Sequence, residues 1–266
     1  MNEQDFMLTS LLKCRRVDLA VGTKELTAEQ RSEFGKMVER RAHGEPLQYI
    51  IGHCDFMGTT LSVDKSVLIP RPETELLVEL ALKEFKSSDN RCTINILDLG
   101  TGSGNIAITL AKNIQNSSIM ALDIHEDSLC LALKNAKDNH VAQKIEFLRK
   151  DMITYLKEVF ERNIKFDMII TNPPYIRTSD LDQLPLDVQQ EPRSALDGGS
   201  DGLRFYRSII RCAHKVLHPQ GYLLMEIGDD QSDDIKELFK RYPQYKDVKF
   251  YKDYVGTDRM VIARTV

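Results

Sequence analysis

The stretch INILDLGTGSGNIAI, residues 94–108, decides the fold. It begins with a short and mostly apolar run, as a buried strand does, and ends where an apolar helical pattern starts. Between the two, Gly100, Gly102 and Gly104 permit positive φ angles and let the backbone approach a ligand closely. The first N–H groups of the following helix are free to bind that ligand. The stretch therefore predicts a strand, a ligand-binding turn and a helix.

An acidic residue follows at the end of the next predicted strand. A carboxylate at Asp123 suits bidentate hydrogen bonding to ribose hydroxyls. The sequence GSGNIA, residues 102–107, also fits the dinucleotide fingerprint with alanine last. The loop alone therefore indicates an adenosine-containing cofactor and leaves a nicotinamide cofactor and S-adenosylmethionine open. Asp98 would repel a pyrophosphate but suits a ligand that carries an amino group and a sulfonium.

From residue 93 onward, strand and helix patterns alternate along the chain. Such repeated units predict a mostly parallel sheet with helices on both faces. No helix separates the last two strands, which predicts an antiparallel pair at the sheet edge. The predicted strands are 94–99, 119–123, 145–149, 167–171, 221–227, 247–251 and 259–264, and the predicted helices are 104–115, 126–139, 152–161, 203–217 and 231–241.

The part of the chain before this alternation has a different pattern. Helical periodicity dominates its start, a hairpin with Gly58 near its turn is predicted over 55–64, and another helix runs to about residue 85. The polar stretch 87–91 reads as a domain boundary. We therefore predict a helical domain at 1–50, a hairpin and linker helix at 51–90, and a cofactor-binding domain at 91–266.

Composition narrows the class of protein. The chain has 266 residues, 42% of them hydrophobic, and a net charge of −4, which argues against an enzyme that grips a nucleic-acid backbone. The five cysteines are scattered and contain no CxxC pair, so neither a disulfide framework nor a metal site is predicted. No leader or membrane-spanning run is evident. We expect a cytoplasmic protein that does not bind membranes.

A second motif, TNPPYI at residues 171–176, follows the fourth predicted parallel strand. Asn172 then lies at the carboxyl edge of the sheet, beside the glycine loop. Pro173 and Pro174 fix two φ angles and make a stiff turn with free carbonyl groups. The Asn172 amide oxygen and a backbone carbonyl offer two acceptors to a planar NH₂ group, and Tyr175 offers an aromatic face. The motif suits a primary amide or the exocyclic amine of a base, unless it is only a rigid turn.

Together, DLGTGSG at 98–104 and NPPY at 172–175 resemble the class I S-adenosylmethionine-dependent amino-methyltransferases. Other stretches resemble the HemK/PrmC-type protein-(glutamine-N5) methyltransferases of peptide chain release factors, and the match runs from about residue 37 to the end. These stretches are RRAHGEPLQYI at 40–50, VLIPRPETE at 67–75, EPRSAL at 191–196, DGL at 201–203 and DYVGTDR at 253–259. The segment 67–75 discriminates best, because NPPY also occurs in adenine and guanine methyltransferases.

The resemblance implies a fold and a reaction. The fold would be the Rossmann-like class I methyltransferase fold. It has a mostly parallel seven-stranded sheet with an antiparallel C-terminal strand, preceded by a small helical domain and a β-hairpin linker. The methyl donor would be S-adenosylmethionine, and the substrate the glutamine of the Gly-Gly-Gln motif in a class 1 release factor. The helical domain would dock this protein partner, and no direct contact with nucleic acid is expected.

The resemblance also implies roles for individual residues. The catalytic group would be Asn172, Pro173, Pro174 and Tyr175, with the Asn172 side chain and the Pro173 carbonyl holding the glutamine amide. The cofactor would contact Gly100, Thr101, Gly102, Ser103, Gly104, Asp123, Asp151, Met152 and Asn172. Relatives often have an aromatic residue where Met152 stands, so stacking on adenine would be weaker here. Pro70, Arg71 and Glu73 would form the pocket wall, without assigned roles.

Two other functions stay open at this point. The first is an amino-methyltransferase that acts on a nucleic-acid base, at adenine N6 or guanine N2, because it would use the same NPPY chemistry. The second is a cofactor-binding scaffold without catalysis. The preferred release factor, the oligomeric state and the angle between the domains do not follow from the sequence.

Overall fold

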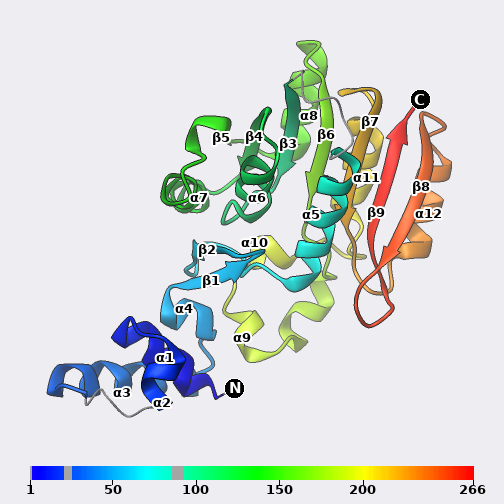
Figure 1. The fold of residues 1–266 in the computed structure, drawn as a ribbon. Coiled ribbons are helices and arrows are strands. Elements are labelled where there is room, and N and C mark those ends of the chain that lie inside the picture. Colours follow the sequence, from blue (N-terminus) through cyan, green and yellow to red (C-terminus); the bar gives the residue numbers. More distant parts are fainter. Residues whose placement is uncertain (1, 21–25, 86–92) are drawn as a thin grey trace.

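A computed structural model describes residues 2–20, 26–85 and 93–266 of the chain. Its main feature is a seven-stranded sheet in the order β5-β4-β3-β6-β7-β9-β8 (Figure 1). All neighbouring pairs up to β7 are parallel, and β9 runs antiparallel to both of its neighbours. The strands are β3 (Ile94–Leu99), β4 (Ser117–Asp123), β5 (Ile145–Arg149), β6 (Phe166–Thr171), β7 (Leu217–Glu226), β8 (Tyr245–Lys252) and β9 (Asp258–Thr265). The predicted fold class and the antiparallel C-terminal pair are confirmed.

Helices cover both faces of the sheet and bury an apolar core on each. One face packs against α5 (Pro72–Phe85), α6 (Asn105–Asn113) and α7 (Glu126–Asp138). The other face packs against α8 (Met152–Glu161), α11 (Arg204–Ala213) and α12 (Ser232–Lys240). Because the central strands are buried on both faces, their sequences are mostly apolar rather than alternating.

The N-terminal helices form a separate small cluster below the sheet in Figure 1. They are α1 (Glu3–Leu12), α2 (Arg16–Ala20), α3 (Ala28–Ala42) and α4 (Leu47–Ile51). Met7, Met37 and Ile50 form their buried core. The Arg41 guanidinium donates to both carboxylate oxygens of Glu3, at 2.9 and 2.8 Å, and so ties α3 to α1.

The hairpin of β1 (His53–Phe56) and β2 (Thr59–Ser62) connects this cluster to the sheet. The Asn135 side chain on α7 accepts a hydrogen bond from the Ser62 backbone N–H at 2.8 Å. The same side chain donates to the backbone carbonyls of Ser62, at 3.0 Å, and Ser103, at 2.9 Å. One buried amide therefore joins the hairpin to the glycine loop.

Two sequence predictions need comment. The predicted helix 203–217 is wrong at its end, because α11 stops at Ala213 and Leu217 already pairs with Phe166 in the sheet. Its apolar residues fit a helical face, but pairing with β6 takes precedence. The predicted boundary at 87–91 lies outside the described residues, and the division into three domains stays a prediction.

No helix in the described part of the chain is long and apolar enough to cross a bilayer.

Between β6 and α11 the chain forms short elements that the sequence did not predict. They are the 3₁₀ helix η2 (Thr178–Gln183), α9 (Leu186–Gln189) and α10 (Arg193–Leu196). An isolated bridge between Ile176 and Asp197 joins the two ends of this segment, which we call the excursion (residues 176–197). The excursion lies next to the carboxyl edge of the sheet, so it supplies one wall of the cavities described next.

Candidate active site

Two cavities lie at the carboxyl edge of the sheet, and Asn172 lines both of them. Each has a volume of about 310 Å³, which lies at the lower end of the range for small-molecule sites. The first cavity is lined by the glycine loop and by the residues that follow β4 and β5. The second is lined by Tyr175, Arg259 and the excursion before α11. The two motifs predicted from the sequence therefore do meet at one place.

The glycine loop is shaped for close contact with a ligand. Gly104 is the N-cap of α6 with φ +83°, and a Cβ there would lie 2.9 Å from the Ile108 side chain. Gly102 has φ +53°, and a Cβ there would meet no atom within 4 Å. Because Gly102 lines the first cavity, that Cβ would occupy space which the loop leaves open for a ligand.

Asp123 holds the loop as well as lining the first cavity. Its carboxylate accepts from the Gly102 backbone N–H on one oxygen and from the His125 backbone N–H on the other, both at 3.0 Å. Each oxygen keeps lone pairs for further donors. The carboxylate is thus fixed by the backbone and still able to accept from ribose hydroxyls.

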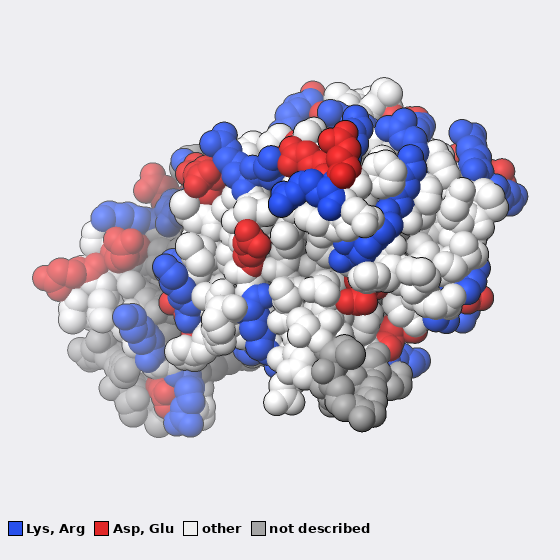
Figure 2. Space-filling model, turned by 90° about the horizontal axis from the view of Figure 1, so that it is seen from above, with Lys and Arg blue, Asp and Glu red and all other residues white. Residues whose placement is uncertain are grey.

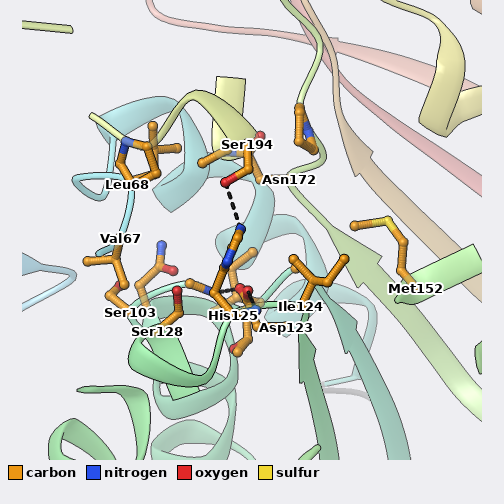
Figure 3. Close-up of a pocket in the computed structure, with 18 of the residues that line it drawn as sticks. Val67, Leu68, Ser103, Asp123, Ile124, His125, Ser128, Met152, Asn172 and Ser194 are labelled. Carbon is orange, nitrogen blue, oxygen red and sulfur yellow. Dashed lines mark hydrogen bonds between the residues drawn. The ribbon is translucent and has the colours of Figure 1, made fainter. Parts of the chain in front are cut away.

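Asp151 and Met152 also line the first cavity. Asp151 is the N-cap of α8 and accepts from the Thr154 backbone N–H at 2.8 Å, so helix capping by itself accounts for this residue type. Figure 3 shows Met152 on one side of the cavity and Val67 and Leu68 on the other. All three side chains add apolar surface to the lining of this cavity.

Two polar side chains near the loop are buried without full hydrogen bonding. Asp98 accepts from the Thr101 hydroxyl at 2.7 Å on one oxygen, while its other oxygen has no partner. Burial raises the pKa of Asp98 to about 7. Asp98 does not line the cavity, whereas Ser103, whose hydroxyl is also unpaired, does.

The NPPY residues divide between the cavities. Pro174 lines the first, Tyr175 lines the second, and Pro173 is buried and lines neither. The Asn172 side-chain NH₂ donates to the Thr74 hydroxyl at 3.0 Å, and Thr74 donates to the Glu226 carboxylate at 2.6 Å. The Tyr175 hydroxyl also donates to Glu226, at 3.4 Å.

Arg71 and Glu191 fasten the excursion to the cavity wall. Their side chains form an ion pair, and Glu191 also accepts from the Ile69 backbone N–H at 2.9 Å. Burial raises the pKa of Glu191, and the charge of Arg71 opposes that shift. Pro70 lines the first cavity and Glu73 the second, while Arg71 lines both. The segment 67–75 therefore forms the wall between the two cavities.

A further contact crosses the first cavity from the other side. The His125 ring reaches the Ser194 hydroxyl on α10 at 2.8 Å, as the dashed line in Figure 3 shows. It links the loop after β4 to the excursion, and both residues line the cavity. Both are exposed, so the link contributes little to stability.

Sequence reasoning missed three residues that organise the site: Thr74, Glu191 and Glu226. Thr74 and Glu191 lie inside the stretches that carry the family resemblance, but no role could be read from them. Glu226 had a visible signal, because an acid at the end of a buried apolar strand is rare unless it is paired. Its partners come from distant parts of the chain, so the sequence could not name them.

The face of the molecule that is seen from above carries no large patch of basic side chains alone. Figure 2 shows Lys and Arg side chains interspersed with Asp and Glu over this side of the molecule. At the carboxyl edge of the sheet, on another side of the molecule, opposite charges also pair, for example Arg177 with Asp230 at 2.6 Å. Among the described residues, no group of three or more His, Cys, Asp or Glu side chains is arranged to hold a metal ion.

We expect the unfolding free energy to decrease as the pH rises from about 5.5 to 8. Burial raises the pKa of Asp98 and of Glu226 to about 7 each, so the fold favours their neutral forms. In the unfolded chain both acids are ionised over this whole range, so each buried acid lowers the unfolding free energy by up to about 2 kcal/mol between pH 5.5 and 8, mostly below pH 7. Denaturant unfolding at both pH values measures this change.

The variant Asp98→Asn is the control for that prediction. It cannot ionise, so its stability should vary less with pH over the same range than that of the wild type. An equal pH dependence in both proteins would show that Asp98 is not the group that titrates.

Comparisons with known proteins bear on the whole chain. A family model described as a methyltransferase domain matches residues 91–258, and one described as a PrmC N-terminal domain matches residues 2–52. The release factor glutamine methyltransferase of Nitratidesulfovibrio vulgaris is 40% identical over 98% of this chain and 86% of its own length. That of Moorella thermoacetica is 39% identical over 90% of this chain and 82% of its own length.

Solved structures agree on the fold. The hMettl16 catalytic domain in complex with an RNA hairpin aligns with a TM-score of 0.60 at 15% identity, over 90% of this chain and 82% of that one. A methyltransferase from Pyrococcus furiosus aligns with a TM-score of 0.54 at 18% identity, over 90% of this chain and 98% of that one. At such low identity these likenesses concern the fold alone.

Proposed function

The chain belongs to the release factor glutamine methyltransferases, and from this membership we propose that it methylates the side-chain amide nitrogen of a release-factor glutamine with S-adenosylmethionine as donor. We propose further that the substrate is a class 1 release factor and that the glutamine is that of its Gly-Gly-Gln motif. The observation that carries the site assignment is that Asn172 lines both cavities. A donor in one and an acceptor in the other would meet at this residue.

The first cavity fits the methyl donor. The loop from Gly100 to Gly104 leaves space at Gly102 for a close ligand, and Gly100, Thr101 and Ser103 line the same cavity. Asp123 would accept from the ribose hydroxyls. Met152 would contact the adenine ring opposite Leu68, with Asp151 beside it. Asp98 does not line the cavity, and because burial raises its pKa to about 7, its charge would favour a cationic ligand only above that pH.

The second cavity fits the glutamine side chain. Asn172 would accept a hydrogen bond from the amide NH₂ through its side-chain oxygen. The sequence also predicts the Pro173 carbonyl as second acceptor, but Pro173 is buried and lines neither cavity, so only Asn172 is proposed to accept from a ligand in this cavity. The Tyr175 ring lines this cavity and would lie against the amide plane. Pro174 keeps the turn rigid, since its φ angle is fixed.

The chain's own contribution to catalysis is positioning. When bound, S-adenosylmethionine supplies a methyl group on a sulfonium, so that a carbon–nitrogen bond forms as the carbon–sulfur bond breaks. An amide nitrogen is a poor nucleophile because its lone pair is delocalised. An acceptor that holds its NH₂ group turns the lone pair toward the methyl group, and no general base need act before transfer. Correct positioning contributes at most about 7–11 kcal/mol to such a reaction.

A methyl-transfer assay with three acceptors tests this function. Labelled S-adenosylmethionine is supplied with a release factor, with DNA and with ribosomal RNA. Label is expected in the release factor, and it should be lost when the glutamine of its Gly-Gly-Gln motif is changed to alanine. Label in DNA or RNA alone would instead identify a nucleic-acid methyltransferase, and label in none of them a scaffold.

The remaining expectations depend on the substrate. The proposed reaction requires an interaction with the release factor, and the absence of direct contact with nucleic acid stays a prediction. The role of residues 1–50 in docking the release factor stays a prediction, as does a cytoplasmic location.

A further inference from the structure

The orientation of the Asn172 side chain is set by a chain of hydrogen bonds from distant residues. Its NH₂ group donates to the Thr74 hydroxyl at 3.0 Å, and that hydroxyl donates to the Glu226 carboxylate at 2.6 Å. Thr74 is at the start of α5, and Glu226 is the last residue of β7. Thr74 and Glu226 are each 1% exposed, so water does not compete for these bonds.

The hydroxyl of Thr74 has only one proton to donate. While Glu226 is ionised it can only accept, so the Thr74 proton is committed to the carboxylate. The Thr74 hydroxyl can then only accept a hydrogen bond from Asn172. Only the NH₂ end of the Asn172 amide can donate that bond. The oxygen end of Asn172 must therefore point away from Thr74, and it is the end that a substrate NH₂ group needs.

We propose that Thr74 and Glu226 are positioning residues of the methyl transfer, which orient the Asn172 amide oxygen toward the substrate NH₂ group. This inference rests on the proposed function and extends it. We do not propose that either residue touches the substrate amide. Thr74 lines only the first cavity, and Glu226 lines neither cavity. They act through Asn172.

The polarity of this chain of bonds depends on the charge of Glu226. If Glu226 were protonated, its O–H could donate to Thr74, and Thr74 could then donate to the oxygen of Asn172. The Asn172 amide would turn over and present its NH₂ group to the NH₂ group of the substrate. Two donors would face each other, and the acceptor that the reaction needs would be lost.

The groups around Glu226 bring its pKa into a pH range in which enzyme activity can be measured. Burial raises the pKa of Glu226 to about 7, against the hydrogen bond from Thr74 and the charge of Arg259 on β9. Glu73 on α5 adds to the increase. The Tyr175 hydroxyl faces the same carboxylate, and the Tyr206 hydroxyl on α11 donates to the Glu226 backbone carbonyl at 3.1 Å. Asp229 pairs with Arg259 nearby.

The first test compares two substitutions at Thr74. Thr74→Val keeps the shape but removes the hydroxyl, whereas Thr74→Ser keeps the hydroxyl. The loss of one buried hydrogen bond predicts a decrease of about 10- to 30-fold in kcat/KM for the release factor in Thr74→Val. Thr74→Ser should stay within about threefold of the wild type. Because Thr74 also lines the first cavity, kcat/KM is compared at saturating S-adenosylmethionine, and a cooperative thermal transition shows that both variants are folded.

The second test uses the pH profile and does not depend on the first. The wild-type rate should rise with pH through about 7 and then level off, as Glu226 ionises. In Glu226→Gln the side chain cannot ionise, so this rise with pH should disappear, whatever level of activity remains. Asp98 is intact in both proteins, so its titration cancels in the comparison.

The outcomes separate the two proposals. If the wild type modified no release factor, the proposed function would fail, and the positioning role with it. If the wild type was active but Thr74→Val matched it, or lost no more than Thr74→Ser, only the positioning role would be rejected. The same conclusion would follow if Glu226→Gln kept the wild-type pH profile.

Discussion

Asn172→Ala should lower the turnover of release-factor methylation by about 10²–10³-fold while the Kd of S-adenosylhomocysteine changes by less than about threefold. The alanine removes the side-chain oxygen that is proposed to hold the substrate amide, and removal of one preorganised hydrogen-bonding group commonly has an effect of this size. The wall of the first cavity stays otherwise intact. Single-turnover rates and calorimetric titration of the product cofactor measure the two quantities.

A matched control is Asn139→Ala, at the C-terminal end of α7. Asn139 also makes side-chain hydrogen bonds, to the carbonyls of Thr60 and Asn135, but it lines neither cavity. It should keep near-normal turnover. If Asn172→Ala lost affinity for the cofactor and kept its turnover, Asn172 would belong to the donor site and not to the acceptor site.

Asp123→Ala should have the opposite signature, with donor affinity reduced by about 10- to 100-fold and a smaller effect on turnover at saturating donor. The substitution removes the proposed acceptor for the ribose hydroxyls, which is worth about 1.5–3 kcal/mol for a charged partner. It also frees the backbone N–H groups of Gly102 and His125. Equilibrium titration with S-adenosylmethionine and with S-adenosylhomocysteine measures the loss.

Asp123→Asn sharpens this prediction. The carboxylate uses one oxygen for each of two backbone N–H groups, and a carboxamide can satisfy only one of them. We therefore expect little recovery of affinity relative to Asp123→Ala. Asp138→Ala on α7, whose carboxylate is exposed and pairs with Lys134, is the control that should bind the donor normally. Full affinity in Asp123→Asn would mean that Asp123 does not fix the loop.

The position of the site was predictable because its signals are local. A glycine loop between a strand and a helix, and an Asn-Pro-Pro turn after a later strand, each depend on residues close together in sequence. Parallel strands carry their carboxyl ends to one edge of the sheet, so the two motifs had to lie on the same side. The wrong end of the helix predicted at 203–217 shows the limit of this reasoning: Leu217 fits a helical face, but it pairs in the sheet.

The sequence by itself determined the sheet, the place of the two motifs and the family, because periodicity and turn chemistry act over a few residues. Only the tertiary structure decided which way Asn172 points and what closes its cavities. Those features depend on the bonds of Asn172 to Thr74 and Thr74 to Glu226, and on the pair of Arg71 with Glu191. These pairs are 98, 152 and 120 positions apart, and no local pattern specifies which buried donor will meet which acceptor.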